Sequence, residues 1–362
     1  MNLSAKFRVA VLMGGISPEH DISLLSGVSI IKNLDRRKYN IKPIVVSKND
    51  EWFVSKGFLK EDDFLPKHYF KKGQNPDDPE VKKMTFGQVI DQTLKKEADF
   101  IFIAMHGKFG EDGSLQAILD YIGLPYNGSG VAASALAMDK VVSKALFKKG
   151  GLLTPDHFVV KRSEWNKNKP LIQKDVEIQF GFPCVIKVPC GGSSIGVEIP
   201  QDKDQFRKSM DELITNSLCI IVERYISGRE FTCGVLESLK NGRCEALPVV
   251  EIKPKESIYF DLKAKYDEKA CDEIIPAQVS PQISNEIQHI SLTAHEILGC
   301  RTYSRSDIIL SDKDENLYIM ETNTLPGFTE NSLLPKEALA HGMSMIQLID
   351  RIIETSRKKE SS

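Results

Sequence analysis

The 362-residue sequence has no long hydrophobic run and no strong excess of charge of either sign. No apolar run approaches the roughly 20 residues that a membrane-spanning helix needs. With 48 basic and 50 acidic residues the net charge is −2, which favours neither nucleic acid nor a membrane surface as a partner. Residues 1–14 contain one short apolar strand and lack the pattern of a signal peptide. We therefore expect a globular, cytoplasmic protein.

Cysteine motifs are also missing. None of the seven cysteines forms a Cys-x-x-Cys pair, which argues against a zinc site or a thioredoxin-type motif. An odd number of cysteines without a signal peptide indicates free thiols in a reducing compartment. The Gly-Lys-Ser/Thr core of a P-loop is absent as well, so any phosphate site must be of another kind.

The length of the chain suggests two or three domains. Residues 1–124 alternate strand and helix patterns, which predicts a doubly wound parallel sheet whose first helix has Ser17 as its N-cap. Residues 49–83 are polar and predict irregular surface structure or an insertion. A small α+β unit is expected over 125–222 and a strand-rich unit over 223–362. The predicted fold class is therefore α/β combined with α+β.

The most informative tract is a β-hairpin near the C-terminus, where two apolar runs flank a turn over residues 312–316. Asp307 lies just inside the first strand, and Glu321 and Asn323 end the second strand on one face. Two carboxylates and an amide are hard oxygen ligands suited to Mg²⁺. Arg305, two residues before Asp307, can stabilise developing negative charge. This combination is typical of phosphoryl transfer, and a surface hairpin with solvated charges is the alternative.

A lysine and a glycine run indicate an anion site elsewhere in the chain. Lys187 is embedded in an apolar strand, where an ammonium group is costly unless it meets an anion. Three glycines over residues 190–196 let backbone amides approach a phosphate, although a plain glycine hairpin has the same composition. Lys140, within a predicted helix, is by itself an ordinary surface residue.

Five motifs, in order along nearly the whole chain, carry a family resemblance. They are Gly-Gly-Ile-Ser-Pro-Glu at 14–19, His-Gly-Lys-Phe-Gly-Glu-Asp-Gly-Ser-Leu-Gln at 106–116, the glycine run after Lys187, Glu-Arg-Tyr-Ile-Ser-Gly-Arg-Glu at 223–230, and the hairpin continuing as Asn-Thr-Leu-Pro-Gly-Phe-Thr-Glu-Asn-Ser-Leu at 323–333. Together they resemble the D-alanine–D-alanine ligase family of the ATP-grasp superfamily. The resemblance implies a Rossmann-like substrate domain (1–124), a central ATP-grasp lid subdomain (125–222) and a C-terminal ATP-grasp subdomain with the metal site (223–362).

The resemblance also implies roles for individual residues. In this family two lysines contact the ATP phosphates beneath a flexible glycine lid, and two carboxylates seven residues apart read adenine and ribose. The nucleotide-contacting residues implied for this chain are Lys140, Lys187, Ser194, Glu223, Ile226 and Glu230. Two Mg²⁺ ions, with Mn²⁺ as an alternative, are implied at Asp307, Glu321 and Asn323.

The remaining motifs imply an amino-acid site. Glu19 suits a substrate ammonium group, although helix-dipole compensation is a sufficient reason for an acid in a first helical turn. The residues implied to act in catalysis are Glu19, Ser193, Tyr266, Arg305 and Gly327. The residues implied to bind substrate are His106, Glu111, Lys265, Ser332 and Leu333.

The loop that contains Tyr266 departs in part from the family pattern. Leu262 and Lys263 stand where the family usually has an aromatic residue and a glutamate. Depsipeptide ligases carry histidine at a position related to Tyr266, so the tyrosine favours an amine as the attacking group.

The implied reaction joins two D-alanine molecules with ATP through an acyl phosphate and supplies peptidoglycan synthesis. The nearest alternative is a ligase that joins D-alanine to D-serine or D-lactate. A carboxylase or glutathione-type ligase is more distant, because the 106–116 tract argues against it. A nucleotide sensor without catalysis is disfavoured by the intact arginine and metal-ligand set of the hairpin. Because the family is usually dimeric, we expect a homodimer.

Overall fold

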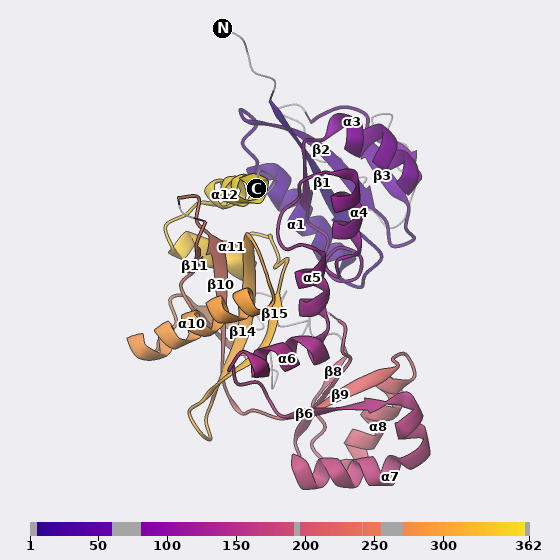
Figure 1. Ribbon diagram of the computed structural model, residues 1–362, viewed down its shortest axis with the longest axis vertical. Helices are drawn as coiled ribbons and strands as arrows, with labels where there is room; N and C mark the ends of the chain where they lie inside the picture. Colours follow the sequence, from indigo (N-terminus) through magenta and orange to yellow (C-terminus); the bar gives the residue numbers. More distant parts are fainter. Residues whose placement is uncertain (1–5, 60–80, 192–195, 241, 255–270, 359–362) are drawn as a thin grey trace.

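The computed structural model describes residues 6–59, 81–191, 196–240, 242–254 and 271–358. Figure 1 shows an N-terminal sheet domain at one end of the molecule and a small lobe with helices α7 and α8 at the other. The C-terminal sheet lies beside the chain segment that connects them. Each of these parts has its own sheet, and within the described ranges the sheets have five, four and six strands.

The N-terminal sheet has the strand order β4-β3-β2-β1-β5. Its strands are β1 (Phe7–Gly14), β2 (Tyr39–Val46), β3 (Trp52–Ser55), β4 (Val81–Met84) and β5 (Phe100–Ile103). The central strand β1 pairs in parallel with β2 and β5, as the sequence pattern predicts. The inner part of β1 (residues 9–13) and β5 are buried on both faces, in keeping with their continuous apolar runs. The helical segments of this domain are α1 (His20–Asn33), α2 (Phe86–Gln88), η2 (Val89–Leu94), α3 (Lys95–Glu97) and α4 (Ser114–Ile122).

Two predictions for this domain are wrong. Segment 49–83 contributes the antiparallel strands β3 and β4, so the sheet is mixed rather than wholly parallel. β3 forms because Trp52 and Val54 are buried against the core despite the polar residues around them. Helix α1 begins at His20 with Glu19 at the N-cap position. Ser17 lies two residues before that position, where its hydroxyl accepts the N–H of Glu19 at 3.2 Å and donates to the carbonyl oxygen of His106 at 2.7 Å.

The central lobe contains an antiparallel sheet with the order β6-β9-β7-β8. Its strands are β6 (His157–Lys161), β7 (Cys184–Lys187), β8 (Val197–Glu198) and β9 (Cys219–Arg224). Helices α7 (Arg162–Gln179) and α8 (Lys203–Ile214) pack on this sheet. Before it come α5 (Val131–Met138) and α6 (Lys140–Lys149). Asp139 separates the two, because its carboxylate accepts the N–H groups of Val141 and Val142 and so caps α6.

The C-terminal sheet has the order β13-β12-β10-β14-β15, and β11 pairs with β10. Its strands are β10 (Gly228–Glu237), β11 (Cys244–Ala246), β12 (Val250–Pro254), β13 (Cys271–Ile274), β14 (Tyr303–Ser311) and β15 (Leu317–Asn323). The helices that pack with it are α10 (Pro281–Ile297), α11 (Leu333–Ala340) and α12 (Met345–Lys358).

Candidate active site

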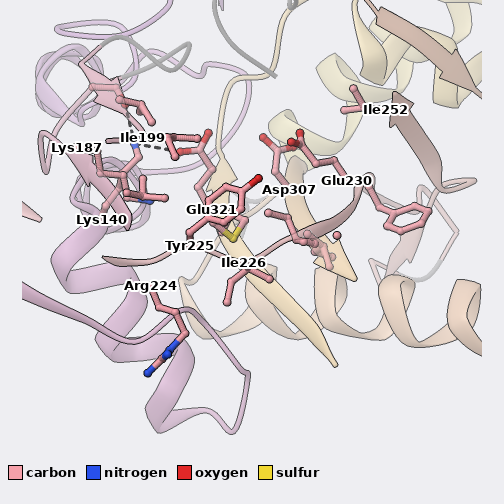
Figure 2. Close-up of a pocket in the computed structure, with 18 of the residues that line it drawn as sticks. Lys140, Lys187, Ile199, Arg224, Tyr225, Ile226, Glu230, Ile252, Asp307 and Glu321 are labelled. Carbon is pink, nitrogen blue, oxygen red and sulfur yellow. Dashed lines mark hydrogen bonds and ion pairs between the residues drawn. The ribbon is translucent and has the colours of Figure 1, made fainter. Parts of the chain in front are cut away.

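A cleft lies between the central sheet and the C-terminal sheet (Figure 2). Apolar side chains such as Ile199, Ile252 and Met320 line it, together with the charged groups of Lys140 and Lys187. Further lining residues come from the β7–β8 region, from the connection between β9 and β10, from the start of β10 and from the hairpin β14–β15, and they include Val185, Val197, Tyr225, Ile226, Glu230, Asp307, Ile308 and Glu321. Apolar walls combined with convergent charged groups suit a ligand that has a flat apolar ring and a polyanionic tail.

The predicted acidic hairpin is present as β14 and β15. Asp307 lies opposite Glu321 in the strand register, with a bulge directly after Asp307. Arg305 contacts Asp307, with 3.2 Å between Nε and Oδ1, and the Asn323 amide donates to Oδ2 of the same carboxylate at 3.5 Å. Burial favours a lower pKa for Arg305, but Asp307 outweighs it and the pKa is raised. Arg305 is therefore a permanent cation beside the acids.

The chemistry of this donor set fits a magnesium ion. The described residues contain no cluster of three or more His, Cys, Asp and Glu side chains arranged for a metal. The hairpin instead offers the oxygens of Asp307 and Glu321 and an amide oxygen from Asn323. The Thr232 hydroxyl donates to Asp307 Oδ1 at 2.7 Å and so orients the carboxylate from behind. Hard oxygen donors with few carboxylates are typical of Mg²⁺ bound together with phosphates.

Lys140 begins helix α6 and reaches across the cleft to the hairpin. Its Nζ lies 3.1 Å from Oε2 of Glu321 and donates a hydrogen bond to the carbonyl oxygen of Gly191 at 2.7 Å (Figure 2). The side chain is buried, which favours a lower pKa, but Glu321 outweighs burial and raises the pKa of Lys140. The alternative reading of Lys140 as an ordinary surface residue is therefore wrong.

Lys187, at the end of β7, has an anionic partner as the apolar strand predicts. Its Nζ lies 2.9 Å from Oε2 of Glu223 on the neighbouring strand β9. Glu223 is fully buried and is absent from the residues that line the cleft, so its carboxylate faces the lysine instead. Burial alone would raise the pKa of Glu223, but the lysines around it lower the pKa. Arg224 points away from the acidic hairpin and donates to the carbonyl oxygen of Gln179 at 3.0 Å (Figure 2).

His106 follows β5 and links the N-terminal domain to the segment after the hairpin. Its Nε2 lies 2.9 Å from the Ser26 hydroxyl, and its Nδ1 lies 3.1 Å from the Leu325 carbonyl oxygen. Ser26 also accepts the N–H of Phe328 at 3.2 Å. Burial lowers the pKa of His106, which favours a neutral ring that can accept a hydrogen bond as well as donate one.

Glu111 and Glu19 form an acidic pair beside His106. Glu111 accepts the N–H of Gly107 at 2.8 Å and the N–H of Leu325 at 3.3 Å. Burial, assisted by the Glu19 carboxylate, raises the pKa of Glu111 well above its ordinary range. Gly107 has a φ of +70°, and a Cβ there would overlap Glu19 Oε2, so the glycine makes room for that carboxylate.

The tract after the hairpin places the remaining predicted residues close together. A Cβ on Gly327 would lie 2.8 Å from the Ser332 hydroxyl, which in turn accepts the N–H of Thr329 at 3.0 Å. Ser332 precedes α11, and Leu333 is its first residue. The four predicted site residues Ser193, Ser194, Lys265 and Tyr266 lie outside the described residues.

The motifs do not include one residue that belongs to this site. Lys144 lies one helical turn after Lys140 and is fully buried, with its Nζ 3.1 Å from Oε1 of Glu223. The only signal in the sequence is the four-residue spacing, which puts both lysines on one face of a helix. That spacing alone does not distinguish a buried lysine from a solvated one.

A sheet domain followed by a cleft between two further sheets, with lysines facing an acidic hairpin, defines the ATP-grasp class of ATP-dependent ligases. A family model described as D-ala D-ala ligase N-terminus matches residues 8–129, and one described as D-ala D-ala ligase C-terminus matches residues 146–354. The chain therefore belongs to the D-alanine–D-alanine ligase family.

Full-length relatives agree with this assignment. The D-alanine–D-alanine ligase of Leptospira interrogans is 35% identical over 356 residues, which cover 97% of this chain and 99% of the relative. The crystal structure of the Bacillus anthracis ligase complexed with ATP has a TM-score of 0.74 and 32% identity, covering 99% of this chain and 100% of that chain. The VanG D-Ala:D-Ser ligase from Enterococcus faecalis has a TM-score of 0.80 and 28% identity, covering 97% and 100% of the two chains. In the described residues, no helix combines the length and the apolarity needed to span a membrane.

Proposed function

We propose that the protein joins two molecules of D-alanine to D-alanyl-D-alanine and cleaves ATP to ADP and phosphate. One observation carries this proposal. Two lysines from the central part of the chain and two carboxylates from the distant hairpin meet in one cleft, where Lys140 touches Glu321 at 3.1 Å. Membership of the D-alanine–D-alanine ligase family supplies the substrate.

In the first step a carboxylate oxygen of one D-alanine attacks the γ-phosphorus of ATP, which gives an acyl phosphate and releases ADP. Lys140 and Lys187 bind the phosphates. Glu321 and Glu223 hold the two ammonium groups beside the cleft, and each lysine turns from its carboxylate to a phosphate when the nucleotide arrives. Ile226 and Glu230 line the part of the cleft that takes the nucleoside. Glu19 binds the ammonium group of the first D-alanine.

In the second step the amine nitrogen of another D-alanine attacks the acyl carbonyl carbon. The carbonyl oxygen becomes an oxyanion that Arg305 and the Gly327 N–H stabilise, and phosphate then leaves with the bonding electron pair while the amine loses a proton. Ser332 and Leu333, at the start of α11, hold the second carboxylate together with Lys265. His106 and Glu111 position the Leu325 segment beside it.

A magnesium pair would be held by Asp307, Glu321 and Asn323. Bound magnesium neutralises the phosphate oxygens and favours departure of ADP. The chain's own part is to orient these oxygens, which Thr232 and Arg305 do for Asp307 by donating hydrogen bonds to its Oδ1. When Lys140 turns to a phosphate, the Glu321 carboxylate becomes available to a cation.

D-Serine as the second substrate is the nearest alternative, because VanG shares the fold. It is not favoured, since the relatives at 34–35% identity are D-alanine–D-alanine ligases whereas VanG is 28% identical.

We further infer a homodimer in the cytoplasm. Light scattering after gel filtration tests the dimer, which a mass equal to one chain of 40.6 kDa would exclude.

The decisive experiment measures ADP release and dipeptide formation with D-alanine, D-serine, D-lactate and L-alanine as substrates. We expect D-alanyl-D-alanine as the main product and no turnover with L-alanine. Mass spectrometry of the products distinguishes ligation from simple ATP hydrolysis. Preferential formation of a mixed product when D-alanine and D-serine are both present would favour the alternative.

A further inference from the structure

A third lysine lies behind the nucleotide cleft. Lys144 is fully buried on α6, where its Nζ lies 3.1 Å from Oε1 of Glu223 and donates a hydrogen bond to the Thr154 hydroxyl at 2.8 Å. Unlike Lys140 and Lys187, it does not line the cleft. The nucleotide therefore has no direct access to this ammonium group, so its role must be exerted through a neighbour.

That neighbour is Glu223, whose carboxylate is shared by two lysines. Lys144 contacts Oε1 from one side, and Lys187 contacts Oε2 at 2.9 Å from the other. Both Glu223 and Lys144 have no exposed surface, whereas Lys187 retains a small exposed part toward the cleft. A buried carboxylate that loses its only cation is strongly destabilised. If Lys187 were the only lysine beside Glu223, the carboxylate would hold Lys187 firmly.

We propose that Lys144 is a positioning residue that keeps Glu223 neutralised while Lys187 moves from Glu223 to an ATP phosphate. The carboxylate then always has one lysine, and the lysine that faces the cleft is free to bind the anion. This inference rests on the proposed function only in naming ATP as the anion. Lys144 therefore supports the affinity for the nucleotide and does not affect amino-acid binding.

The surroundings of Lys144 agree with such a role. Burial, assisted by the charge of Lys187, lowers the pKa of Lys144 to about 7, although Glu223 opposes the change. Other charged or titratable groups that act on this cluster are Glu321 on β15, His157 on β6 and Lys140 on α6. Phosphates bound at Lys187 add negative charge beside the cluster and therefore favour the protonated lysine.

The test compares Lys144→Met with the wild type. Methionine keeps the length and apolar volume but removes the charge. Binding of ATP in the absence of D-alanine, followed by calorimetry, should weaken at least about tenfold, because Glu223 then retains Lys187. The KM for ATP should rise correspondingly, and the KM for D-alanine should change less than about twofold. The matched control is Lys148→Met, one turn further along α6 on a side chain that is 44% exposed, and it should bind ATP as the wild type does.

The double variant Lys144→Met, Glu223→Gln separates this role from a structural one. Once the carboxylate is neutral, Lys187 is free again, so the double variant should bind ATP at least about threefold more tightly than Lys144→Met alone. If the single variant does not fold, the double variant decides on its own: binding within about threefold of the wild type supports the inference. Unchanged ATP binding by a folded Lys144→Met, or a double variant no better than the single one, would overturn it. Wild-type ATP binding without D-alanine ligation would contradict only the proposed function, because these ratios need no turnover.

Discussion

Replacing Glu337 by glutamine should prevent the loss of folding stability that this side chain causes at alkaline pH. Glu337 lies on α11 with no exposed surface, and its Oε1 accepts the N–H of Gly234 at 3.0 Å. Its other oxygen, Oε2, is buried and has no hydrogen-bond partner among the described residues. Burial raises the pKa of Glu337 to about 8, and the nearby Arg305 offsets this only in part.

The size of the effect follows from proton linkage. The ordinary pKa of 4.5 applies to the unfolded chain and the value of about 8 to the folded protein, so the folded state alone keeps the proton between these values. Stability that is present at low pH is therefore lost as the pH rises from about 4.5 to about 8. A pKa difference of about 3.5 (8 minus 4.5) corresponds to at most ~4.8 kcal/mol at 1.36 kcal/mol per pKa unit. Relaxation around the charge should reduce this to roughly 2–4 kcal/mol.

The assay is urea unfolding at pH 5 and pH 9 for the wild type, Glu337→Gln and Glu296→Gln. Glu296 is an exposed glutamate on α10 and provides the control. The glutamine at 337 still accepts the Gly234 N–H and cannot ionise, so the variant should gain roughly 2–4 kcal/mol relative to the wild type between the two pH values. Between pH 5 and pH 9, the free energy of unfolding of the Glu296→Gln control should change by the same amount as that of the wild type. The reasoning would be refuted if the free energy of unfolding of Glu337→Gln also changed with pH by the same amount as that of the wild type.

Three further outcomes are expected. Gly234→Ala should lower stability by roughly 1–3 kcal/mol in thermal unfolding, because the new Cβ would lie 2.6 Å from Glu337 Oε2 and 2.7 Å from Leu334 Cδ1; an unchanged melting temperature would contradict this. Arg305→Met should lower D-alanine-dependent phosphate release by about 10²–10³-fold while ATP still binds, and equal activity would remove the oxyanion role. Asp307→Asn should raise the magnesium concentration needed for half-maximal ADP formation at least about tenfold, and an unaltered magnesium curve would exclude this ligand.

Parts of the fold and site that depend on local patterns could be predicted from the sequence. Although the bulge after Asp307 sets its pairing with Glu321, the two apolar runs around a polar turn are enough to predict the hairpin itself. The same holds for Lys187, because a lysine inside an apolar strand requires an anion. The alternative of a surface hairpin with solvated charges does not hold for Arg305, which lies on β14 and is buried.

The remaining features depend on contacts between distant residues. Ser17 has the right side chain for an N-cap, but the helix begins only at His20, and the Ser17 hydroxyl bonds the Glu19 N–H and the distant His106 carbonyl oxygen. Helix α7 contains Pro170 and a kink at Asn168, which interrupt the helical periodicity that would have indicated it. Lys144 and Glu337 are ordinary helix residues by sequence, and only the packing of α6 and α11 against strands buries their charges.

Hydrogen bonds to the N-terminal domain hold the segment that carries Gly327. The Leu325 carbonyl oxygen contacts His106, the Leu325 N–H reaches Glu111, and the Phe328 N–H reaches Ser26. Recombination between two family members at the border of the N-terminal domain would therefore separate this segment from the residues that form these hydrogen bonds. A chimera assembled from such parents should work only when the donor of the first domain also contributes the stretch around residues 324–328.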